Sequence, residues 1–315
     1  MRILVAGATG ALGKQLVPRL VERGHEVTGM TRSPGKIDML RAVGATPAVA
    51  DALDPDAVAR VVAEAQPDAI IHQLTALSKI GMMRNADRAF AQTNRLRIEG
   101  TDHLLAAGRA VGVQRFIAQS FAGWPARRTG GPVKTEDDPF DTDPPATVRE
   151  TLSAIRHVEE AVVGADWTVG IALRYGGFYG PGTSMDLAGG EHVDLIRKRR
   201  MPIVGNGGGV WSFIHIADAA EATIAALTHG ERGVYNIVDD EPAPVREWLP
   251  EMASELGAKP PRHVPRFVGR LLAGEAMAVM MTDIRGASNA KARAMLDWTP
   301  AHSSWRGAFA GTAQA

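Results

Sequence analysis

The chain contains no cysteine among its 315 residues. This absence excludes disulfide bridges and thiolate metal ligands, although it does not identify a cellular compartment. No charged leader with an apolar signal core precedes the first apolar run, so we expect a cytoplasmic protein. Hydrophobic residues make up 45% of the sequence, which is enough to fill the core of one large domain or two interlocked ones.

The sequence also lacks an excess of charge of either sign, because Lys plus Arg and Asp plus Glu both total 35. Such a chain has no overall field that attracts nucleic acid or an anionic membrane. One basic cluster, IRKRR at 196–200, is interpreted as a solvated helix end. The best candidate for a membrane span, 267–281, is broken by Arg270 and Glu275. We therefore expect a small-molecule substrate and no nucleic-acid or membrane partner, with a homodimer as the assembly to consider.

A glycine-rich stretch, MRILVAGATGALG, opens the chain at residues 1–13. Its apolar run from Ile3 to Ala6 is typical of a strand covered on both faces. Gly7 then permits a tight turn, Gly10 allows close approach of a pyrophosphate, and Gly13 allows a helix to pack on the strand. Amide groups of that helix point at the anion. The stretch predicts a phosphate cradle whose candidate cofactor-binding residues are Gly7, Thr9, Gly10, Ala11, Leu12 and Gly13.

Helix and strand signals alternate along the rest of the chain, as in a parallel sheet with helices on both faces. We expect helices at 11–23, 55–66 and 86–111, and strands at 25–30, 46–51, 68–74, 115–119, 167–175 and 234–240. The polar stretch from Trp124 to Glu150 is rich in Pro, Gly and Asp, and its length makes it a candidate lid.

The predicted fold class is α/β, a Rossmann-type doubly wound parallel sheet with a small, mostly helical C-terminal substrate domain. Residues 1–175, together with 210–240, are assigned to the cofactor-binding domain. Residues 176–209 and 241–315 are assigned to the substrate-binding domain.

Several motifs give the chain a family resemblance. It resembles the extended short-chain dehydrogenases/reductases, which include nucleotide-sugar epimerases and dehydratases. The resemblance covers nearly the whole chain and implies a nicotinamide dinucleotide across the sheet, with the substrate above it under the small domain. The matching motifs are GATGALG (7–13), FIAQS (116–120), LRYGGFYGPG (173–182), FIHIADAA (213–220), YNIVDDEP (235–242) and LDWTP (296–300).

The end of the second predicted strand favours NADP over NAD. A carboxylate there would accept hydrogen bonds from the free ribose hydroxyls of NAD, but the sequence has Thr31, Arg32 and Ser33. A guanidinium beside hydroxyl groups suits a 2′-phosphate. The alternative is that Arg32 is a solvated loop residue. The resemblance adds positions near the adenine and under the cofactor, which fall on Asp51, Ala52, Leu74, Thr75 and Ala76.

The family's catalytic pair is missing. Its reductases use a tyrosine and a lysine four residues apart on one helix, where the tyrosine supplies a proton and the lysine lowers its pKa. Counting back from Glu159, which resembles the family's helix, the tyrosine position falls on Thr151 and the lysine position on Ile155. A register shifted by one gives Leu152 and Arg156. No tyrosine occurs between the fifth and sixth predicted strands, so the pair is absent in either register.

Three residues are candidates for the chemistry in place of that pair. Ser120 matches the family's hydroxyl at the end of the fifth strand and is expected to stabilise charge on a substrate oxygen. Tyr175 follows the sixth strand and is the first substitute for the acid, although packing explains a tyrosine there at least as well. Thr151 is the third candidate because it takes the tyrosine's position, but the pKa of its hydroxyl is far too high to replace a phenol.

Aromatic residues suggest the kind of substrate. Sugar-nucleotide members hold a diphosphate with an arginine before the strand that resembles FIHIAD, but Trp211 stands there in this chain. An apolar, uncharged ketone, aldehyde or enone would suit such a site. The alternative, which is equally favoured, is that Trp211 belongs to the core. Candidate substrate-binding residues are Phe121, Trp124, Phe178, Tyr179 and Trp211.

Three classes of function follow. The first is an NADP-dependent oxidoreductase with an unconventional acid, the second a lyase or isomerase on the same fold, and the third a non-catalytic NADP-binding sensor. Turnover at the reduced-nicotinamide absorbance band separates the first from the others. None of the nine histidines has a metal-ligand spacing such as HExxH, so no metal is expected.

Overall fold

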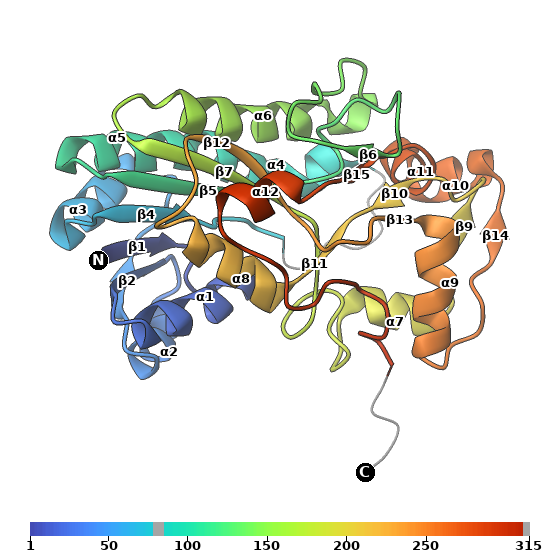
Figure 1. Cartoon of the computed structure of the whole chain (residues 1–315), viewed down its shortest axis with the longest axis horizontal. Helices are drawn as coiled ribbons and strands as arrows, with labels where there is room; N and C mark the ends of the chain where they lie inside the picture. The colour runs from blue at the N-terminus through green and yellow to red at the C-terminus, as the bar shows by residue number, and fades with distance from the viewer. Residues whose placement is uncertain (78–84, 311–315) are drawn as a thin grey trace, which may run out of the picture.

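A parallel sheet of seven strands is the centre of the molecule (Figure 1). The computed structural model describes residues 1–77 and 85–310. Strand order places β1 and β4 side by side at the point where the chain reverses its direction of winding, which is where such sheets bind ligands. From edge to edge the strands are β3 (Thr46–Val49), β2 (Glu26–Thr31), β1 (Arg2–Ala6), β4 (Ala69–His72), β5 (Arg115–Phe121), β7 (Val169–Tyr175) and β12 (Gly233–Ile237).

Helices cover both faces of this sheet, as the alternating sequence pattern predicts. One face packs against α1 (Ala11–Glu22), α8 (Ile216–Ala225) and α12 (Ala290–Met295), and also contacts α2 (Ile37–Ala42), which follows the short η1 (Pro34–Lys36). The other face packs against α3 (Pro55–Ala65), α5 (Thr101–Val111) and α6 (Arg149–Gly164). The predicted fold class is therefore confirmed.

Local signals explain where these helices begin. Asp54 caps α3 by accepting hydrogen bonds from the amides of Asp56 and Ala57, while Pro55 occupies the first helical position. Asn85 caps α4 (Ala86–Arg95) by accepting from the amide of Arg88. The single helix predicted at 86–111 runs through α4 and α5 but contains a π-helical segment, η2 (Leu96–Gly100), between them. Such segments often occur at functional sites.

A smaller unit follows the sheet and has its own core. Its centre is aromatic, with Trp248 and Trp305 fully buried and Trp211 packed 4.9 Å from Trp248 between ring centroids. Phe309, near the end of the described chain, is also buried there. Its elements are β8 (Gly177–Tyr179), α7 (Glu191–Arg197), β9 (Ile203–Val204), β10 (Val210–Trp211), β11 (Phe213–His215), β13 (Ala243–Pro244), α9 (Val245–Glu255), β14 (His263–Val264), α10 (Arg266–Ala273) and α11 (Glu275–Thr282).

The boundaries between the two cores differ from the assigned domains in two places. Trp211 and Phe213, assigned to the cofactor domain, pack in the core of the smaller unit. Leu296 and Trp298, assigned to the substrate domain, pack against the sheet with α1 and α8. Both differences arise because the chain crosses between the cores more than once, which a division into sequence segments does not capture.

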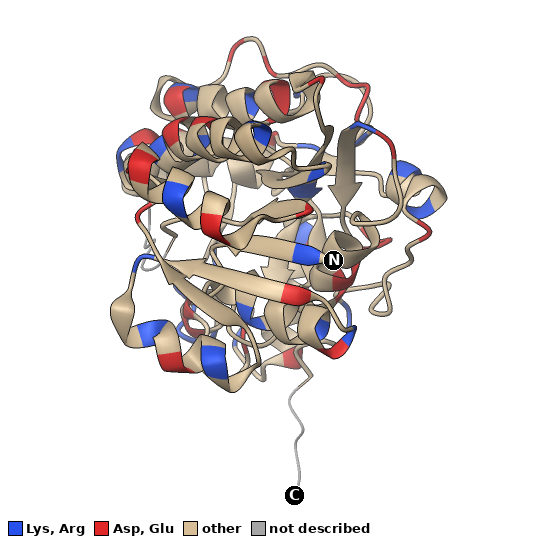
Figure 2. Ribbon diagram, turned by 90° about the vertical axis from the view of Figure 1, so that its left-hand side faces the viewer, with Lys and Arg blue, Asp and Glu red and all other residues tan. Residues whose placement is uncertain are grey.

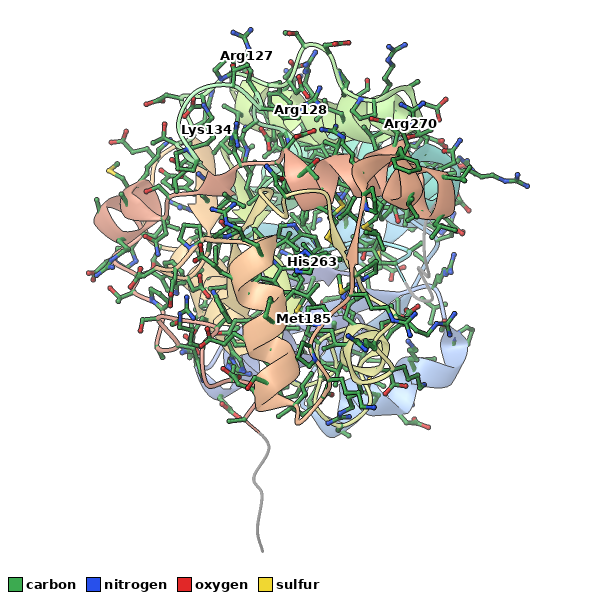
Figure 3. All side chains as sticks on the ribbon, turned by 90° about the vertical axis from the view of Figure 1, so that its right-hand side faces the viewer. Arg127, Arg128, Lys134, Met185, His263 and Arg270 are labelled. Atoms are coloured by element: carbon green, nitrogen blue, oxygen red, sulfur yellow. The ribbon has the colours of Figure 1, made fainter. Side chains whose placement is uncertain are left out.

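The stretch predicted as a candidate lid is fastened to the rest of the molecule. It contains β6 (Val133–Lys134), which pairs with β15 (Gly286–Ala287), and η3 (Ala146–Val148). Two ion pairs also brace the stretch internally: Arg128 donates to Asp141 at 2.7 Å, and Lys134 donates to Asp138 at 2.9 Å. Figure 3 shows Arg127, Arg128 and Lys134 gathered on this loop above the smaller unit.

Charges of both signs are mixed over the surface. Acidic and basic residues alternate along the outer helices in the view of Figure 2. At the predicted basic cluster, Lys198 pairs with Asp194 at 3.1 Å at the end of α7. The apolar stretch at 267–281 forms two short helices separated by Gly274. Within the described part of the chain, no helix is long and apolar enough to cross a membrane.

Candidate functional site

The turn between β1 and α1 is shaped by its glycines. Gly7 has a φ of +92°, and a Cβ there would lie 2.6 Å from the carbonyl oxygen of Gln73. A Cβ on Gly13 would lie 2.4 Å from the carbonyl oxygen of Gly7, so only glycine lets α1 pack this closely. Gly10 differs, because its φ of −74° suits any residue and its added Cβ would approach only the Gly7 carbonyl, at 3.3 Å. The space over Gly10 is open.

A nicotinamide dinucleotide fits this turn. Gly10 is the N-cap of α1, and no side chain caps the helix or adds an acidic group to its first turn. Ala11 is exposed, while Leu12 and Thr9 are buried under the turn. An uncapped helix N-terminus beside an open glycine offers amide donors to a pyrophosphate. These residues would hold the diphosphate of the cofactor.

The end of β2 lies beside the same turn. The hydroxyl groups of Thr9 and Thr31 are 3.2 Å apart, and Thr31 also accepts from the amide of Ser33. Arg32 is exposed and forms no hydrogen bond or ion pair with any residue of 1–77 or 85–310. Its guanidinium is therefore free to bind an external anion.

The other expected cofactor positions border the same edge of the sheet. Asp51 is exposed and accepts from the amide of Leu53, and the carbonyl of buried Ala52 is 2.9 Å from Nδ1 of His103. Leu74, Thr75 and Ala76 are half-buried after β4. The amide of Ala76 donates to the hydroxyl of Thr93 on α4, which fixes this segment at the carboxyl end of β4.

Ser120 is turned toward α6 and is almost fully buried. Its hydroxyl donates to Oε1 of Glu159 at 2.6 Å. Glu159 also accepts from Nε of Arg174 at 2.8 Å and from Nη2 at 2.7 Å, so a buried bidentate ion pair joins α6 to β7. Because its proton is already donated, Ser120 can stabilise a substrate oxygen only by giving up the bond to Glu159.

Thr151 is also committed to a structural contact. Its hydroxyl donates to Oδ1 of Asp87 at 2.8 Å and accepts from Nδ2 of Asn94 at 3.2 Å. Asp87 accepts in addition from the amides of Glu150 and Thr151, which satisfies the first turn of α6. The lysine position, Ile155, is buried in the same helix. A threonine and an isoleucine thus fill the expected catalytic face.

All three tyrosines of the chain are buried with bonded hydroxyl groups. The hydroxyl of Tyr175 lies 2.6 Å from that of Thr223 and accepts from Nε2 of Gln73, and burial raises its pKa. This arrangement fits the packing role rather than that of an acid. Tyr179 donates to a backbone carbonyl, and Tyr235 does the same; burial raises the pKa of both.

Aromatic residues do gather at the carboxyl end of β5. The ring centroid of Trp124 lies 6.1 Å from that of Phe121 and 5.8 Å from that of Phe90, both edge-on. Nε1 of Trp124 is buried and has no hydrogen-bond partner among the described residues. Sequence reasoning missed Phe90, whose helical position gives no sign of its role. These three rings form an apolar cluster with a free donor.

The other expected substrate residues lie elsewhere. Tyr179 packs against Phe309 in the core of the smaller unit. Trp211 donates from Nε1 to the carbonyl of Met280 at 2.9 Å and is also core. Both assignments as substrate-binding residues are corrected to packing roles, because neither side chain is accessible. Phe178 is half-buried against Tyr175, on the face of the sheet opposite α6.

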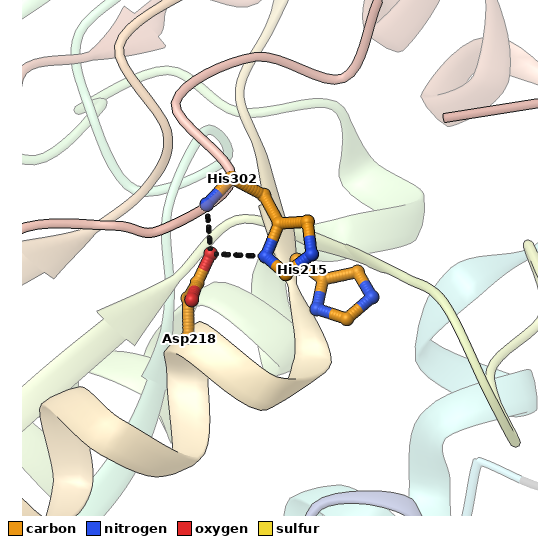
Figure 4. Close-up of side chains that lie close together, drawn as sticks. All are labelled: His215, Asp218 and His302. Atoms are coloured by element: carbon orange, nitrogen blue, oxygen red, sulfur yellow. Dashed lines mark hydrogen bonds and ion pairs between the residues drawn. The ribbon is translucent and has the colours of Figure 1, made fainter. Parts of the chain in front are cut away.

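A cluster of two histidines and an aspartate lies near the start of α8 (Figure 4). Asp218 accepts from the backbone amide and from Nδ1 of His302, and the rings of His302 and His215 are stacked 3.8 Å apart. His215 accepts from the amide of Ala217 and so caps the helix. Ligand atoms of this cluster could hold a metal ion, but its hydrogen bonds already explain it as a fastening of the segment around His302.

Sequence reasoning also missed a buried cation on η2. Arg97 has only 7% of its surface exposed, and its Nη1 has no hydrogen-bond partner in the described chain. Burial lowers its pKa to about 10. Nearby His72 is buried too, and burial together with the Arg97 charge lowers its pKa to about 4. One signal in the sequence could have revealed the buried cation. Asn94, Arg97 and Thr101 are polar residues three and four positions apart, so they recur on the side of the helix that packs against the sheet.

Comparison with known proteins now identifies the family. The model of the NAD dependent epimerase/dehydratase family matches residues 3–238. The chain belongs to this family. This confirms the resemblance seen in its motifs and accounts for the seven-stranded sheet with a glycine turn after β1.

Individual members of the family, or of its fold, differ in what they act on. A 3-diazoavenalumate denitrifying reductase of Streptomyces sp is 43% identical over 311 residues, covering 97% of this chain and 98% of that protein. A 2-alkyl-3-oxoalkanoate reductase of Stenotrophomonas maltophilia (strain K279a) is 29% identical over 269 residues, covering 82% and 76%. The crystal structure of human epimerase family protein SDR39U1 (isoform2) with NADPH superimposes with a TM-score of 0.72 at 21% identity, covering 98% of each chain.

Proposed function

We propose that this member of the family is an NADP-dependent reductase that delivers a hydride to a small, largely apolar substrate whose reduction needs no proton donor. A diazo group in its cationic diazonium form is the acceptor that fits best. The proposal rests on one observation: the hydroxyl groups of all three tyrosines are bonded within the protein. Thr151 and Ile155, which the resemblance places at the family's tyrosine and lysine positions, supply neither a phenol nor an ammonium group.

The chemistry of the acceptor explains why this loss is tolerable. When bound, the nicotinamide cofactor supplies a hydride. Reduction of a carbonyl with a hydride leaves an alkoxide, which needs a proton from a general acid. A hydride and a diazonium cation together contain the atoms and electrons of one N2 molecule and one C–H bond. Hydride addition to the terminal nitrogen gives a diazene, R–N=N–H. Its carbon–nitrogen and N–H bonds then break, N2 leaves, and the N–H proton is returned to the carbon, so there is no net consumption of a proton.

The 43% identity to a denitrifying reductase over nearly both full lengths supports this acceptor. Phe121, Trp124 and Phe90 are the residues proposed to contact the substrate body, because their ring cluster borders the carboxyl end of β5. Edge-on aromatic contacts favour a flat, conjugated substrate.

NADP is proposed as the cofactor on the strength of Arg32. Its guanidinium is exposed and unpaired within the described residues, and it follows Thr31 at the end of β2. The family's description names NAD, whereas the human structure holds NADPH, so the family alone leaves both open. A free arginine beside two hydroxyl groups suits the 2′-phosphate that only NADP carries.

A ketoreductase is the second candidate. The relative from Stenotrophomonas maltophilia favours it, because that protein is named as a reductase of 3-oxoalkanoates. In this case a proton must come from water or from Ser120 after it releases Glu159.

Stoichiometry separates the two candidates. Purified protein is given NADPH with 3-diazoavenalumate, and separately with a 2-alkyl-3-oxoalkanoate, while N2 release and NADPH oxidation are both measured. One N2 released for each NADPH oxidised supports the diazo reductase. Oxidation of NADPH only with the oxoalkanoate supports the ketoreductase and contradicts the first proposal.

Calorimetry tests the cofactor. We expect NADPH to bind more tightly than NADH, and Arg32→Ala to reduce the difference by about tenfold or more, since a charge-assisted contact to phosphate is lost. Arg109→Ala, on the exposed end of α5, is the matched control and should change neither affinity. Equal affinities for NADPH and NADH in the unaltered protein would show that Arg32 has no such role.

A further inference from the structure

Arg97 is a buried charge without a counterion. Its guanidinium forms no ion pair with any described residue, and Nη1 has no acceptor. Arg174, which is buried to a similar degree, is by contrast paired with Glu159. An unpaired buried cation is costly, and proteins retain one where a ligand supplies the missing anion.

The hydrogen bond between His72 and Thr101 fixes the height of Arg97 above the sheet. Nε2 of His72, the last residue of β4, lies 3.0 Å from the hydroxyl of Thr101. The helix after β4 runs back along the sheet, so residues before Thr101 lie closer to the carboxyl edge. Arg97 is four residues earlier, in the π-helical segment η2, and so lies nearer that edge than Thr101. This is the level at which Leu74 and Thr75 leave the sheet.

Contacts with α6 fix its position across the sheet. Asn94 donates to Thr151, and further along the two helices Asp102 lies 2.7 Å from Nε2 of His157. The two helices therefore run side by side in the same direction. Arg97 falls between these two contacts and therefore lies on the side of the helix that faces α6.

We infer that Arg97 binds a carboxylate of the substrate, so that the substrate class is an apolar, conjugated carboxylic acid. This inference rests on the proposed reductase function, because it assigns the anion to the substrate of that site. The cofactor's own phosphates are accounted for by the glycine turn and Arg32, which lie across the β1–β4 switch point. A planar guanidinium binds a carboxylate through two parallel hydrogen bonds.

The aromatic cluster of Phe90, Phe121 and Trp124 would orient the carboxylic acid substrate. Phe90 precedes Arg97 by seven residues on α4, the helix that runs directly into η2, and so lies still nearer the carboxyl edge. Phe90 and Trp124 are 5.8 Å apart between ring centroids. A flat body can therefore rest against the rings while its carboxylate reaches Arg97. Neutral His72 and Asn94 near Arg97 bring no negative charge that would compete.

Binding of two probes that accept no hydride tests the inference. Cinnamate and its uncharged isostere cinnamamide are titrated by calorimetry into protein saturated with NADP+. We expect cinnamate to bind more tightly than cinnamamide. Arg97→Met should weaken cinnamate binding by about ten- to a hundredfold and leave cinnamamide unchanged, whereas Arg97→Lys should retain part of the difference. Arg109→Met is the control.

Two further readouts exclude a structural role. NADPH affinity of Arg97→Met should stay within about twofold of the unaltered protein, and its melting temperature should not fall, because the variant removes an unpaired buried charge. Equal binding of the two probes, binding of neither, an equal loss for both in Arg97→Met, or a loss of NADPH affinity would each overturn the inference. Since neither probe is reduced, the result does not depend on whether a diazo group or a ketone is the true acceptor.

Discussion

The glycine turn after β1 and the seam between α4 and α6 are both parts of a site at the same sheet edge, but they keep the family pattern to different degrees. The turn retains all three glycines, and two of them have no room for a Cβ. In the seam, the resemblance places the family's two catalytic side chains at Thr151 and Ile155, which are packed and carry neither a phenol nor an ammonium group. Backbone geometry cannot be replaced without moving β1 and α1, whereas two side chains can be replaced while the helix stays in place.

The seam keeps its stability through other polar contacts. Asp87 satisfies the first turn of α6, and Glu159 joins that helix to Arg174. The two regions therefore differ in what a substitution should do: changes in the turn should weaken cofactor binding, and changes to the bonded groups Thr151 and Glu159 should lower stability.

Gly10→Val should produce the largest effect, a loss of NADPH binding. Without that loss, the contrast between a binding turn and a structural seam would be wrong. A side chain over the open turn occupies the space of the pyrophosphate, so we expect NADPH binding to fall by at least about a hundredfold in calorimetry. Its φ and ψ suit valine, so the melting temperature should change little. Gly164→Ala, at an open position on α6, is the control. Normal NADPH affinity in a folded Gly10→Val protein would mean that the cofactor lies elsewhere.

Glu159→Ala tests the strongest polar contact of α6, the ion pair with Arg174. It leaves Arg174 buried without a partner and removes the acceptor for Ser120, so we expect a loss of about 3–5 kcal/mol in the free energy of unfolding, measured in urea. Glu160→Ala, the exposed neighbour, should stay within about 0.5 kcal/mol. Similar stability of the two variants would contradict a structural role for the ion pair.

Thr151→Ala should affect stability more than catalysis. It removes a buried donor to Asp87 and an acceptor for Asn94, at a cost of about 1–3 kcal/mol. Turnover of a confirmed substrate should remain within a few-fold, because this hydroxyl is not an acid. A loss of a hundredfold or more in kcat, with NADPH affinity intact, would restore Thr151 as a catalytic residue.

Tyr175→Phe should give the smallest effect. It removes one hydroxyl from the contacts with Thr223 and Gln73, so we expect a loss of about 1 kcal/mol and an unchanged kcat. A general acid would instead cost about a hundredfold to ten-thousandfold in rate. Such a drop in rate would mean that Tyr175 is the general acid, and that the acid therefore lies on the face of the sheet opposite α6.

The sequence was sufficient for the fold, because its signals are local. Ile3 to Ala6 and the three glycines are adjacent in the chain, and the alternation of strands and helices that follows leaves one sheet topology. The family resemblance, confirmed by the match over residues 3–238, followed from short motifs in a fixed order.

The site was harder to predict from the sequence, because its contacts join residues that are distant along the chain. The charge of Arg97 acts on His72, which is not near it in sequence. The burial of Tyr175 depends on Thr223, 48 residues later. Nothing in the sequence alone distinguishes a tyrosine that donates a proton from one that is enclosed by a helix packed later in the chain.

The aromatic core of the smaller unit has a consequence for how the protein is made. Tyr179 donates to the carbonyl of Ser304, and Trp305 and Phe309 complete the packing around it. Six strands of the large sheet have left the ribosome by Tyr175, so most of the cofactor half can assemble during synthesis. The smaller core cannot pack until its last aromatic residues, Trp305 and Phe309, have been synthesised. A premature stop codon after Asp297 would therefore give a chain that can form its glycine turn but lacks Trp305 and Phe309, and so cannot complete the smaller core.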